Sequence, residues 1–158
     1  MNGSVTEVTS VDDLILAIVA AVSAAVTYEV YDGPPTNLPP RTATQFVAIG
    51  ADSMDIDETD PPVESAIMNQ EWKGLGQIAR YETALINCIA VGRADTVKDA
   101  RALAKAVVTD VGQNIGQHPT LASYNALVSE VTSIRSKPTS GGAYVHISFI
   151  ISANARLT

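Results

Sequence analysis

The sequence predicts an α+β domain, with a mostly antiparallel sheet of about four to six strands and two main helices packed on it. Residues 11–26 and 97–111 carry apolar side chains at helical spacing, whereas the segments between and after them have strand-like patterns. Helices and strands do not alternate regularly, so the order differs from that of βαβ units. With 158 residues the chain fits one domain, which we place at residues 11–158 after a flexible N-terminus of residues 1–10.

The first predicted helix follows Ser10, and Asp13 three residues later resembles a capping box with Asp in place of Glu. Leu16 and Val19 lie off its apolar stripe, so we expect the helix to be covered on more than one side, by its own core or by a neighbouring subunit. The apolar run from Leu14 to Val26 is shorter than the roughly 20 residues of a membrane span. No base precedes Arg41, so the run also lacks the basic flank of a signal peptide.

Two short strands, at 28–31 and 45–50, flank a connection with two Pro-Pro pairs. Because proline fixes its own φ and cannot donate to a strand ladder, an extended loop at about 32–44 is a poor hairpin and a good preformed arm. A stiff surface loop is the simpler alternative. If the loop is a preformed arm, the residues that would contact a neighbouring subunit or another partner are Asp32, Gly33, Pro34, Pro35, Pro39, Pro40 and Arg41.

A second extended loop, at about 51–65, reads "ADSMDIDETDPPVES" and is strongly acidic. Its five acids could bring oxygens together for Ca²⁺, but their spacing is not that of an EF-hand and the central glycine is missing. The sequence therefore favours a solvated acidic loop over a metal site. We take Asp55 and Asp57 as candidate interface residues.

Strands are predicted to resume at 66–72 and 79–91, separated by Gly74 and Gly76. The segment 74–79 matches the G-x-G-x-x-A form of a dinucleotide fingerprint, but that motif needs a following helix, and a strand pattern follows here. Arg80 and Glu82 point to the same side of their strand. They could form an ion pair at a rim, or they could pair across a subunit interface.

The second helix is predicted to start at Thr96, with Asp99 as a box-like partner, and to stop at Gly112. Two last strands follow at roughly 124–135 and 143–156, joined as a hairpin by "SKPTSGG". The final strand alternates apolar residues with Tyr144, His146 and Ser148, which is period-two patterning.

Charge is distributed unevenly along the chain, whose net charge is -7. Residues 1–72 contain twelve acids and one base, whereas residues 73–158 contain five acids and nine bases. Either this distribution reflects one acidic loop and chance variation in the rest of the sequence, or an acidic face of one copy meets a basic face of the next. An acidic chain with 5% aromatic residues is a poor candidate for binding nucleic acid.

No pattern in the sequence indicates an enzyme, a cofactor or a metal. Cys88 lies in an apolar strand, where a single thiol is most simply a small buried hydrophobe, and it excludes an internal disulfide. His118 precedes Pro119 in a predicted loop, and neither it nor His146 belongs to a zinc pattern or a nucleophile elbow.

The order of these segments resembles a known family. The pieces that carry the resemblance are "YDGPP" with the downstream "VAIG", the Arg80-x-Glu82 strand and the final Ala155-Arg156-Leu157, and it extends from about Val11 to Leu157. In this order and length the chain is similar to the tail terminator, or tail completion, proteins of long-tailed (siphovirus-like) actinobacterial phages.

The resemblance implies a structural virion protein that forms a hexameric ring at the head-proximal end of the tail tube. Such a ring ends tube polymerisation and meets head-completion or connector proteins, while DNA passes through its lumen. Assembly would occur in the host cytoplasm. Another neck or tail-tube component is an alternative, and a small ligand-binding or enzymatic domain is an alternative of another class. The last would gather Arg80, Glu82, Tyr144 and His146 in one cleft.

Overall fold

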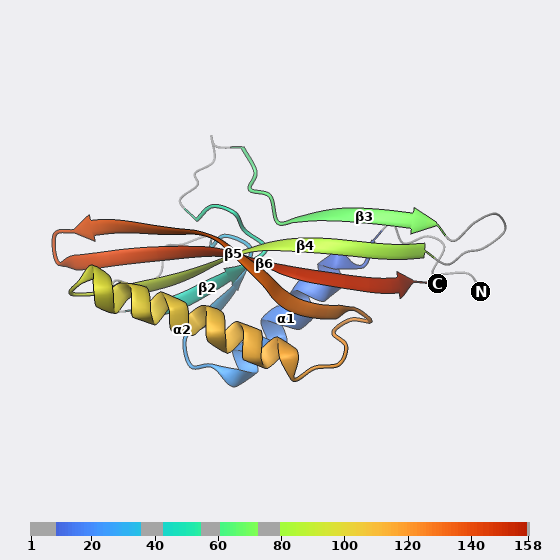
Figure 1. Ribbon diagram of the computed structural model, residues 1–158, viewed down its shortest axis with the longest axis horizontal. Helices are drawn as coiled ribbons and strands as arrows, with labels where there is room; N and C mark the ends of the chain where they lie inside the picture. The colour runs from blue at the N-terminus through green and yellow to red at the C-terminus, as the bar shows by residue number, and fades with distance from the viewer. Residues whose placement is uncertain (1–8, 36–42, 55–60, 73–79, 158) are drawn as a thin grey trace.

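A computed structural model describes residues 9–35, 43–54, 61–72 and 80–157 of the chain. The described residues form two helices and a six-stranded, mostly antiparallel sheet (Figure 1), which confirms the α+β prediction. In chain order the elements are α1 (Val11–Ala25), β1 (Glu29–Asp32), β2 (Gln45–Ile49), β3 (Ala66–Trp72), β4 (Arg80–Ala94), α2 (Val97–Gly116), β5 (Asn125–Thr139) and β6 (Gly142–Leu157).

The long strand β4 organises the sheet, whose order is β1-β2-β4-β6-β5. On one side β4 pairs with β6 over its whole length, from Arg80 opposite Leu157 to Ala94 opposite Ala143. On its other side the first half pairs with β3 and the second half with β2, both antiparallel. Strands β1, β3 and β5 are therefore edges of the described sheet.

The proline-rich connection joins two neighbouring strands that run parallel. Glu29 in β1 lies opposite Phe46 in β2, and Asp32 lies opposite Ile49. Parallel neighbours cannot be joined by a tight hairpin, so the expectation that this connection is no hairpin is confirmed. Pro39, Pro40 and Arg41 lie outside the described residues.

Both helices pack on one face of the sheet (Figure 1), and the main core lies between them and the strands. In β4 the alternate residues Ala84, Ile86, Cys88 and Ala90 are buried in this core. A Cβ placed on Gly92 would lie 2.2 Å from the carbonyl oxygen of Ala100, so α2 approaches β4 more closely than any side chain would allow.

The opposite face, here called the open face, has a smaller apolar cluster. It contains Phe46, Ala48, Ile89 and Val91 from β2 and β4, and Met54 and Val63 from the segment after β2 pack into it. Strand β4 is therefore covered on both faces near its end.

The helix ends differ in detail from the sequence prediction. The side chain of Ser10 makes no capping hydrogen bond; instead the Oγ1 of Thr9 accepts a 3.2 Å hydrogen bond from the backbone N–H of Val11. At α2 the expected cap is present, since the Oγ1 of Thr96 accepts from the N–H of Asp99. The predicted stop at Gly112 is wrong, because α2 continues to Gly116.

The outward side of α1 is not covered within the described chain. Val11, Leu14, Ile18 and Val22 are buried, but Leu16 is exposed. Of the two residues off the stripe, Val19 packs half-buried against the main core, whereas Leu16 lacks the cover that we expected from the chain's own core.

Candidate functional site

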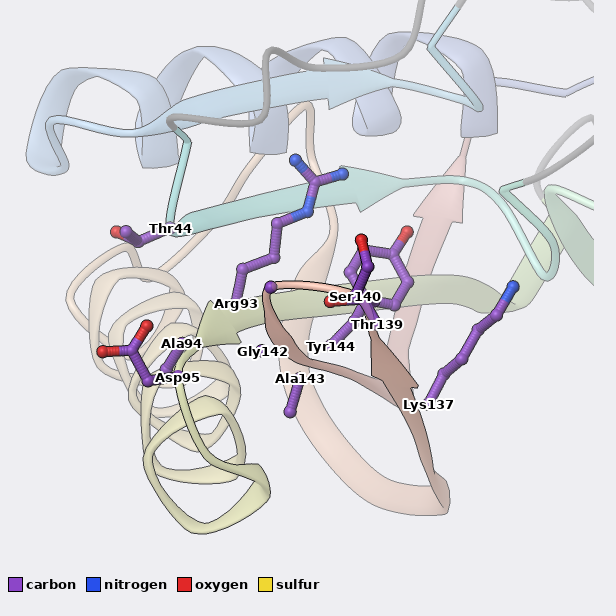
Figure 2. Close-up of a pocket in the computed structure, with 11 residues that line it drawn as sticks. Thr44, Arg93, Ala94, Asp95, Lys137, Thr139, Ser140, Gly142, Ala143 and Tyr144 are labelled. Atoms are coloured by element: carbon purple, nitrogen blue, oxygen red, sulfur yellow. The ribbon is translucent and has the colours of Figure 1, made fainter.

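A pocket lies beside the turn of the β5–β6 hairpin, where the ends of β4, β6 and β5 meet (Figure 2). Arg93 of β4 lies opposite Tyr144 of β6, and Tyr144 lies opposite Lys137 of β5. Residues directly opposite one another in antiparallel strands project from the same face. These three side chains therefore form one row on the open face.

This hairpin pocket has a volume of about 540 Å³. Its remaining lining residues come from the turn, the end of β4 and the start of β2, and they include Thr44, Asp95, Thr139, Ser140 and Gly142. Gly142 fits here because a Cβ would lie 2.4 Å from the carbonyl oxygen of Ala94. The turn therefore lies close to β4 and closes one side of the pocket.

Aromatic rings hold the guanidinium of Arg93 in place. Its Cζ lies 5.3 Å from the centre of the Phe46 ring and 5.0 Å from the centre of the Tyr144 ring. Tyr31 meets Phe46 edge to face at 6.0 Å, and the His146 ring lies 4.5 Å from that of Tyr144. Cation–π contacts of this kind occupy the faces of a guanidinium and leave its N–H groups directed along its edge.

Positive charge continues beyond the pocket. In the next row on the same face, Val91 lies opposite His146 and His146 opposite Arg135. Lys137 and Arg135 are exposed. We call Arg93, Arg135 and Lys137 the basic group; Asp95 is the acid among the described residues that line the pocket. Two cations, four hydroxyls and backbone groups in one concave place suit a carboxylate or another anion.

A second, more polar cleft of about 440 Å³ lies between the end of α1 and the second half of α2. The Tyr28 hydroxyl donates a 2.9 Å hydrogen bond to Oδ2 of Asp110 there. Burial, this hydrogen bond and the Asp110 charge raise the pKa of Tyr28. The hydrogen bond joins the segment after α1 to α2, which is a structural role.

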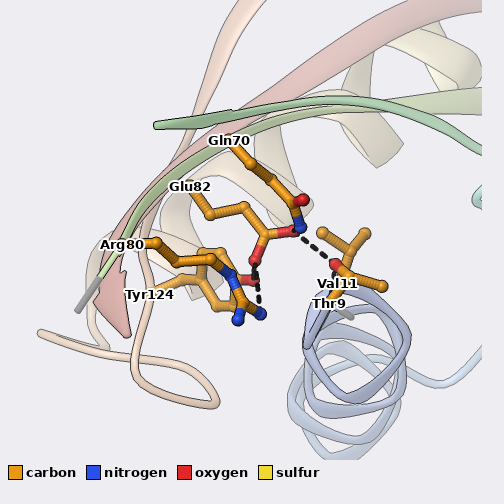
Figure 3. Close-up of polar contacts among 6 residues, drawn as sticks. All are labelled: Thr9, Val11, Gln70, Arg80, Glu82 and Tyr124. Atoms are coloured by element: carbon orange, nitrogen blue, oxygen red, sulfur yellow. Dashed lines mark hydrogen bonds and ion pairs between the residues drawn. The ribbon is translucent and has the colours of Figure 1, made fainter. Parts of the chain in front are cut away.

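A buried polar cluster surrounds Glu82 on the helix-covered side (Figure 3). Oε1 of Glu82 accepts hydrogen bonds from the Thr9 hydroxyl and, at 3.2 Å, from Nε2 of Gln70. Oε2 accepts from the Tyr124 hydroxyl at 2.8 Å and lies 3.8 Å from a guanidinium nitrogen of Arg80. The carboxylate thus joins the start of α1, strand β3 and the residue before β5.

These donors control the ionisation of Glu82. Burial by itself would raise the pKa of Glu82, but the hydrogen bonds from Thr9, Tyr124 and Gln70 and the charge of Arg80 together lower it below its ordinary value. Burial and the neighbouring carboxylate raise the pKa of Tyr124. Glu82 is therefore an ionised acceptor and Tyr124 a protonated donor.

The structure corrects the expectation for Arg80 and Glu82. The predicted same-strand ion pair is present, but the two side chains are only 5% and 0% exposed. They do not lie at a rim, because Glu82 faces the side on which α1 packs. Both contribute to the fold of their own chain, and in the folded subunit neither side chain is on the surface for a neighbour to contact.

The other candidate contact residues lie partly within the described chain. Asp32 is exposed at the end of β1, and Gly33, Pro34 and Pro35 are half-buried beyond it. Asp55 and Asp57 lie outside the described residues. Asp52, at the start of the acidic loop, accepts a 3.1 Å hydrogen bond from the backbone N–H of Glu64 at its end.

The four residues that an enzymatic cleft would have gathered lie in two separate places. Arg80 and Glu82 are in the polar cluster on the helix-covered side, and Tyr144 and His146 are on the open face. His118 is exposed after α2. Among the described residues, no group of three or more His, Cys, Asp or Glu side chains could hold a metal ion. Cys88 is buried, and burial raises its thiol pKa to about 12.

Sequence reasoning did not identify Arg93, Lys137 and Phe46 as members of one site. Period-two patterning placed Tyr144 and His146 on the polar side of β6, which was a usable signal. The pairing register that sets Arg93 and Lys137 on either side of Tyr144 is not visible in any single strand.

No known protein family and no curated protein matches this chain. Within the residues that the structure describes, neither helix has the length and apolarity needed to cross a membrane.

Proposed function

We propose that this protein is a structural subunit that assembles with copies of itself into a ring, as its resemblance to phage tail terminators implies. The observation that supports this best is an exposed apolar stripe across the open face. Ile67 of β3, Leu85 of β4 and Leu127 of β5 lie in one cross-strand row, with Ser152 of β6 between the last two. The three apolar side chains are 53%, 38% and 58% exposed.

This stripe runs from the edge strand β3 to the edge strand β5, interrupted by Ser152. Large exposed apolar side chains that share a row mark contact surfaces more often than scattered ones do. Strand β5 also has Val131 and Ile134 exposed, opposite core residues of β6. A long edge strand with apolar side chains is a template for contact with another chain.

A ring needs a heterologous contact, in which one patch of a subunit meets a different patch of the next. The chain has segments of opposite charge for such a contact, since acids dominate its first 72 residues and bases the remainder. The basic group is a part of this asymmetry that lies on the open face. Complementary charges would fix the orientation of neighbouring copies.

In this proposal the ring caps the head-proximal end of a tail tube and stops its polymerisation. Its other partners are head-completion or connector proteins, and DNA passes through the lumen without specific contacts. The ring forms in the host cytoplasm and ends in the virion. The subunit needs no cofactor and catalyses no reaction.

Light scattering over a wide range of protein and salt concentrations tests self-assembly, and negative-stain microscopy of the protein mixed with tail tubes tests termination. We expect rings that cap one end of the tube. Continuous co-assembly along tubes would favour a tube subunit instead. A protein that stays monomeric at all concentrations and leaves tube ends bare would overturn the proposal.

A further inference from the structure

The hairpin pocket and the basic group have no role in the polar cluster or in the main core. They occupy the open face at the end of the sheet away from Glu82, and they carry more positive than negative charge. A preformed cationic surface in an acidic protein needs an explanation, because most of the chain would repel a polyanion.

We propose that this surface is a docking site for the acidic segment Asp52–Asp60 of a second copy of the chain. This inference rests on the proposed self-assembly. It identifies a contact between two different surfaces of neighbouring copies, which sets how each copy is oriented on the next. The segment has five acids within nine residues and no base. It is the densest run of negative charge in the sequence, as the basic group is the densest described positive surface on the sheet.

The chemistry of the pocket fits carboxylates. The guanidinium of Arg93 is held between two aromatic rings, so it loses little conformational freedom when it binds an anion. Lys137 at the other end of the row adds a second cation, and the Thr139 and Ser140 hydroxyls line the wall between them (Figure 2). Successive acids of an extended segment could meet Arg93, Lys137 and Arg135 in turn.

Geometry favours a polypeptide over a small free anion. The basic group spans three strands, and neighbouring strands lie about 4.8 Å apart. A single carboxylate in the pocket would leave Arg135, which does not line the pocket, without an anion, whereas a segment with several acids can meet all three cations.

Fluorescence anisotropy with a labelled peptide of residues 51–62 tests the site directly. The host is the full chain in which Asp55, Asp57, Glu58 and Asp60 are replaced by their amides, so that four of the five acids of its own segment no longer compete; Asp52 is kept because it accepts the hydrogen bond from Glu64. We expect binding that weakens as salt rises. The double variant R135E/K137E should weaken peptide binding by at least about tenfold, since both side chains are exposed and the two substitutions reverse the local charge.

The matched control is R101E/K105E, which reverses two exposed bases on α2, away from the pocket. It should leave the peptide affinity unchanged. Equal loss in both double variants would show attraction to net charge only and would overturn the inference. Tighter binding of a single-stranded oligonucleotide than of the peptide would overturn it in favour of a nucleic-acid site.

Mixing distinguishes a second copy from the same copy. The amide chain retains the docking site, and the R135E/K137E chain retains the acidic segment. Docking between copies predicts that light scattering of the mixture shows a larger mass than either chain alone. No increase, with the peptide still bound, would mean that the segment docks on its own chain and would overturn the second-copy inference.

These outcomes separate the two proposals. A wild-type chain that forms rings although the peptide does not bind the host overturns the docking inference and leaves the proposed assembly standing. A wild-type chain that associates, with peptide binding and a raised mass on mixing, but forms no rings either alone or with tail tubes, overturns the ring and leaves the docking site.

Discussion

Glu82 is the most deeply buried charged side chain among the described residues. Its carboxylate is fully buried and accepts from three side chains. Because its pKa is lower in the folded chain than in the unfolded one, it stabilises the fold above its ordinary pKa of about 4.3. This stability is lost as the pH falls through the lower folded value.

The substitution Glu82→Gln should lower the free energy of unfolding at pH 7 by about 1–3 kcal/mol. The new amide NH₂ group would face the Tyr124 hydroxyl or the Gln70 amide, and both of these groups are hydrogen-bond donors in the wild-type protein. The difference from wild type should be full above about pH 5.5 and shrink below about pH 4.3. Urea denaturation at several pH values measures both. A difference that is constant down to pH 2 would contradict an ionised Glu82.

Tyr124→Phe is the companion variant, since it removes one donor and keeps the ring. We expect a smaller loss in the free energy of unfolding, of about 1 kcal/mol. The decrease of stability at low pH should remain, because Glu82 keeps its other partners. If the loss of stability at low pH disappeared in this variant, the Tyr124 hydrogen bond, and not the other partners, would be what keeps the pKa of Glu82 low.

Cys88 should not react with thiol reagents in the folded protein. Its side chain is buried in the core, and burial raises its pKa to about 12, so almost no thiolate exists at pH 8. Labelling with a chromogenic disulfide should therefore follow unfolding of the core. Labelling at the rate of a free cysteine in native buffer would contradict this burial.

At the scale of elements, the contact of α2 with β4 limits what Gly92 can become. A Cβ there would lie 2.2 Å from the carbonyl oxygen of Ala100 and 2.6 Å from the amide nitrogen of Ala104. Gly92→Ala should therefore lower the free energy of unfolding by about 1–3 kcal/mol, because the whole helix must shift. Thermal or urea unfolding followed by circular dichroism measures it.

The matched control is Gly112→Ala in the interior of α2. Its Cβ would meet the Val128 side chain at an ordinary distance of 3.7 Å. Since alanine favours helix, this variant should gain about 0.5–1 kcal/mol. Similar losses in both variants would show that α2 tolerates alanine at neither place, and the close approach at Gly92 would not be the cause.

The elements themselves were largely predictable, because periodicity survives in each segment. The patterns placed both helices and all six strands within a few residues. The stop at Gly112 failed because packing of Ile115 into the core extends α2 past a residue that often ends helices. The cap failed at Ser10 because Thr9, held by Glu82, provides the acceptor.

The sites were less predictable, because they depend on register. Nothing local to β4 indicates that Arg93 lies beside Tyr144 and not beside a residue of another strand. Likewise, Glu82 was taken for a rim residue because the sequence does not show that Gln70, Tyr124 and Thr9 converge on it.

At the scale of the whole molecule, the exposed edge of β5 should matter for assembly. Replacing Val131 and Ile134 by Lys should weaken self-association by at least about tenfold, because charges on an edge strand oppose pairing with another chain. Both side chains are exposed, so stability should change little. Sedimentation over a concentration series measures the association.

Leu16→Lys is the control for this variant, since Leu16 is also an exposed apolar residue but lies on α1. It should leave association unchanged if copies meet through the sheet. Loss of association in Leu16→Lys alone would move the contact to the outward side of α1.

The position of Thr9 next to β4 has a consequence for how this domain joins other polypeptide. Thr9 contacts Glu82, and Glu82 lies opposite Ala155 near the end of β6. Thr9 and the end of β6 therefore lie at one place, at the end of the sheet opposite to the turn of the β5–β6 hairpin (Figure 1). A fluorescent protein joined directly before Thr9 or after Leu157 would leave the pocket accessible, and a short linker from Leu157 to Thr9 would allow a circular permutant that begins and ends elsewhere.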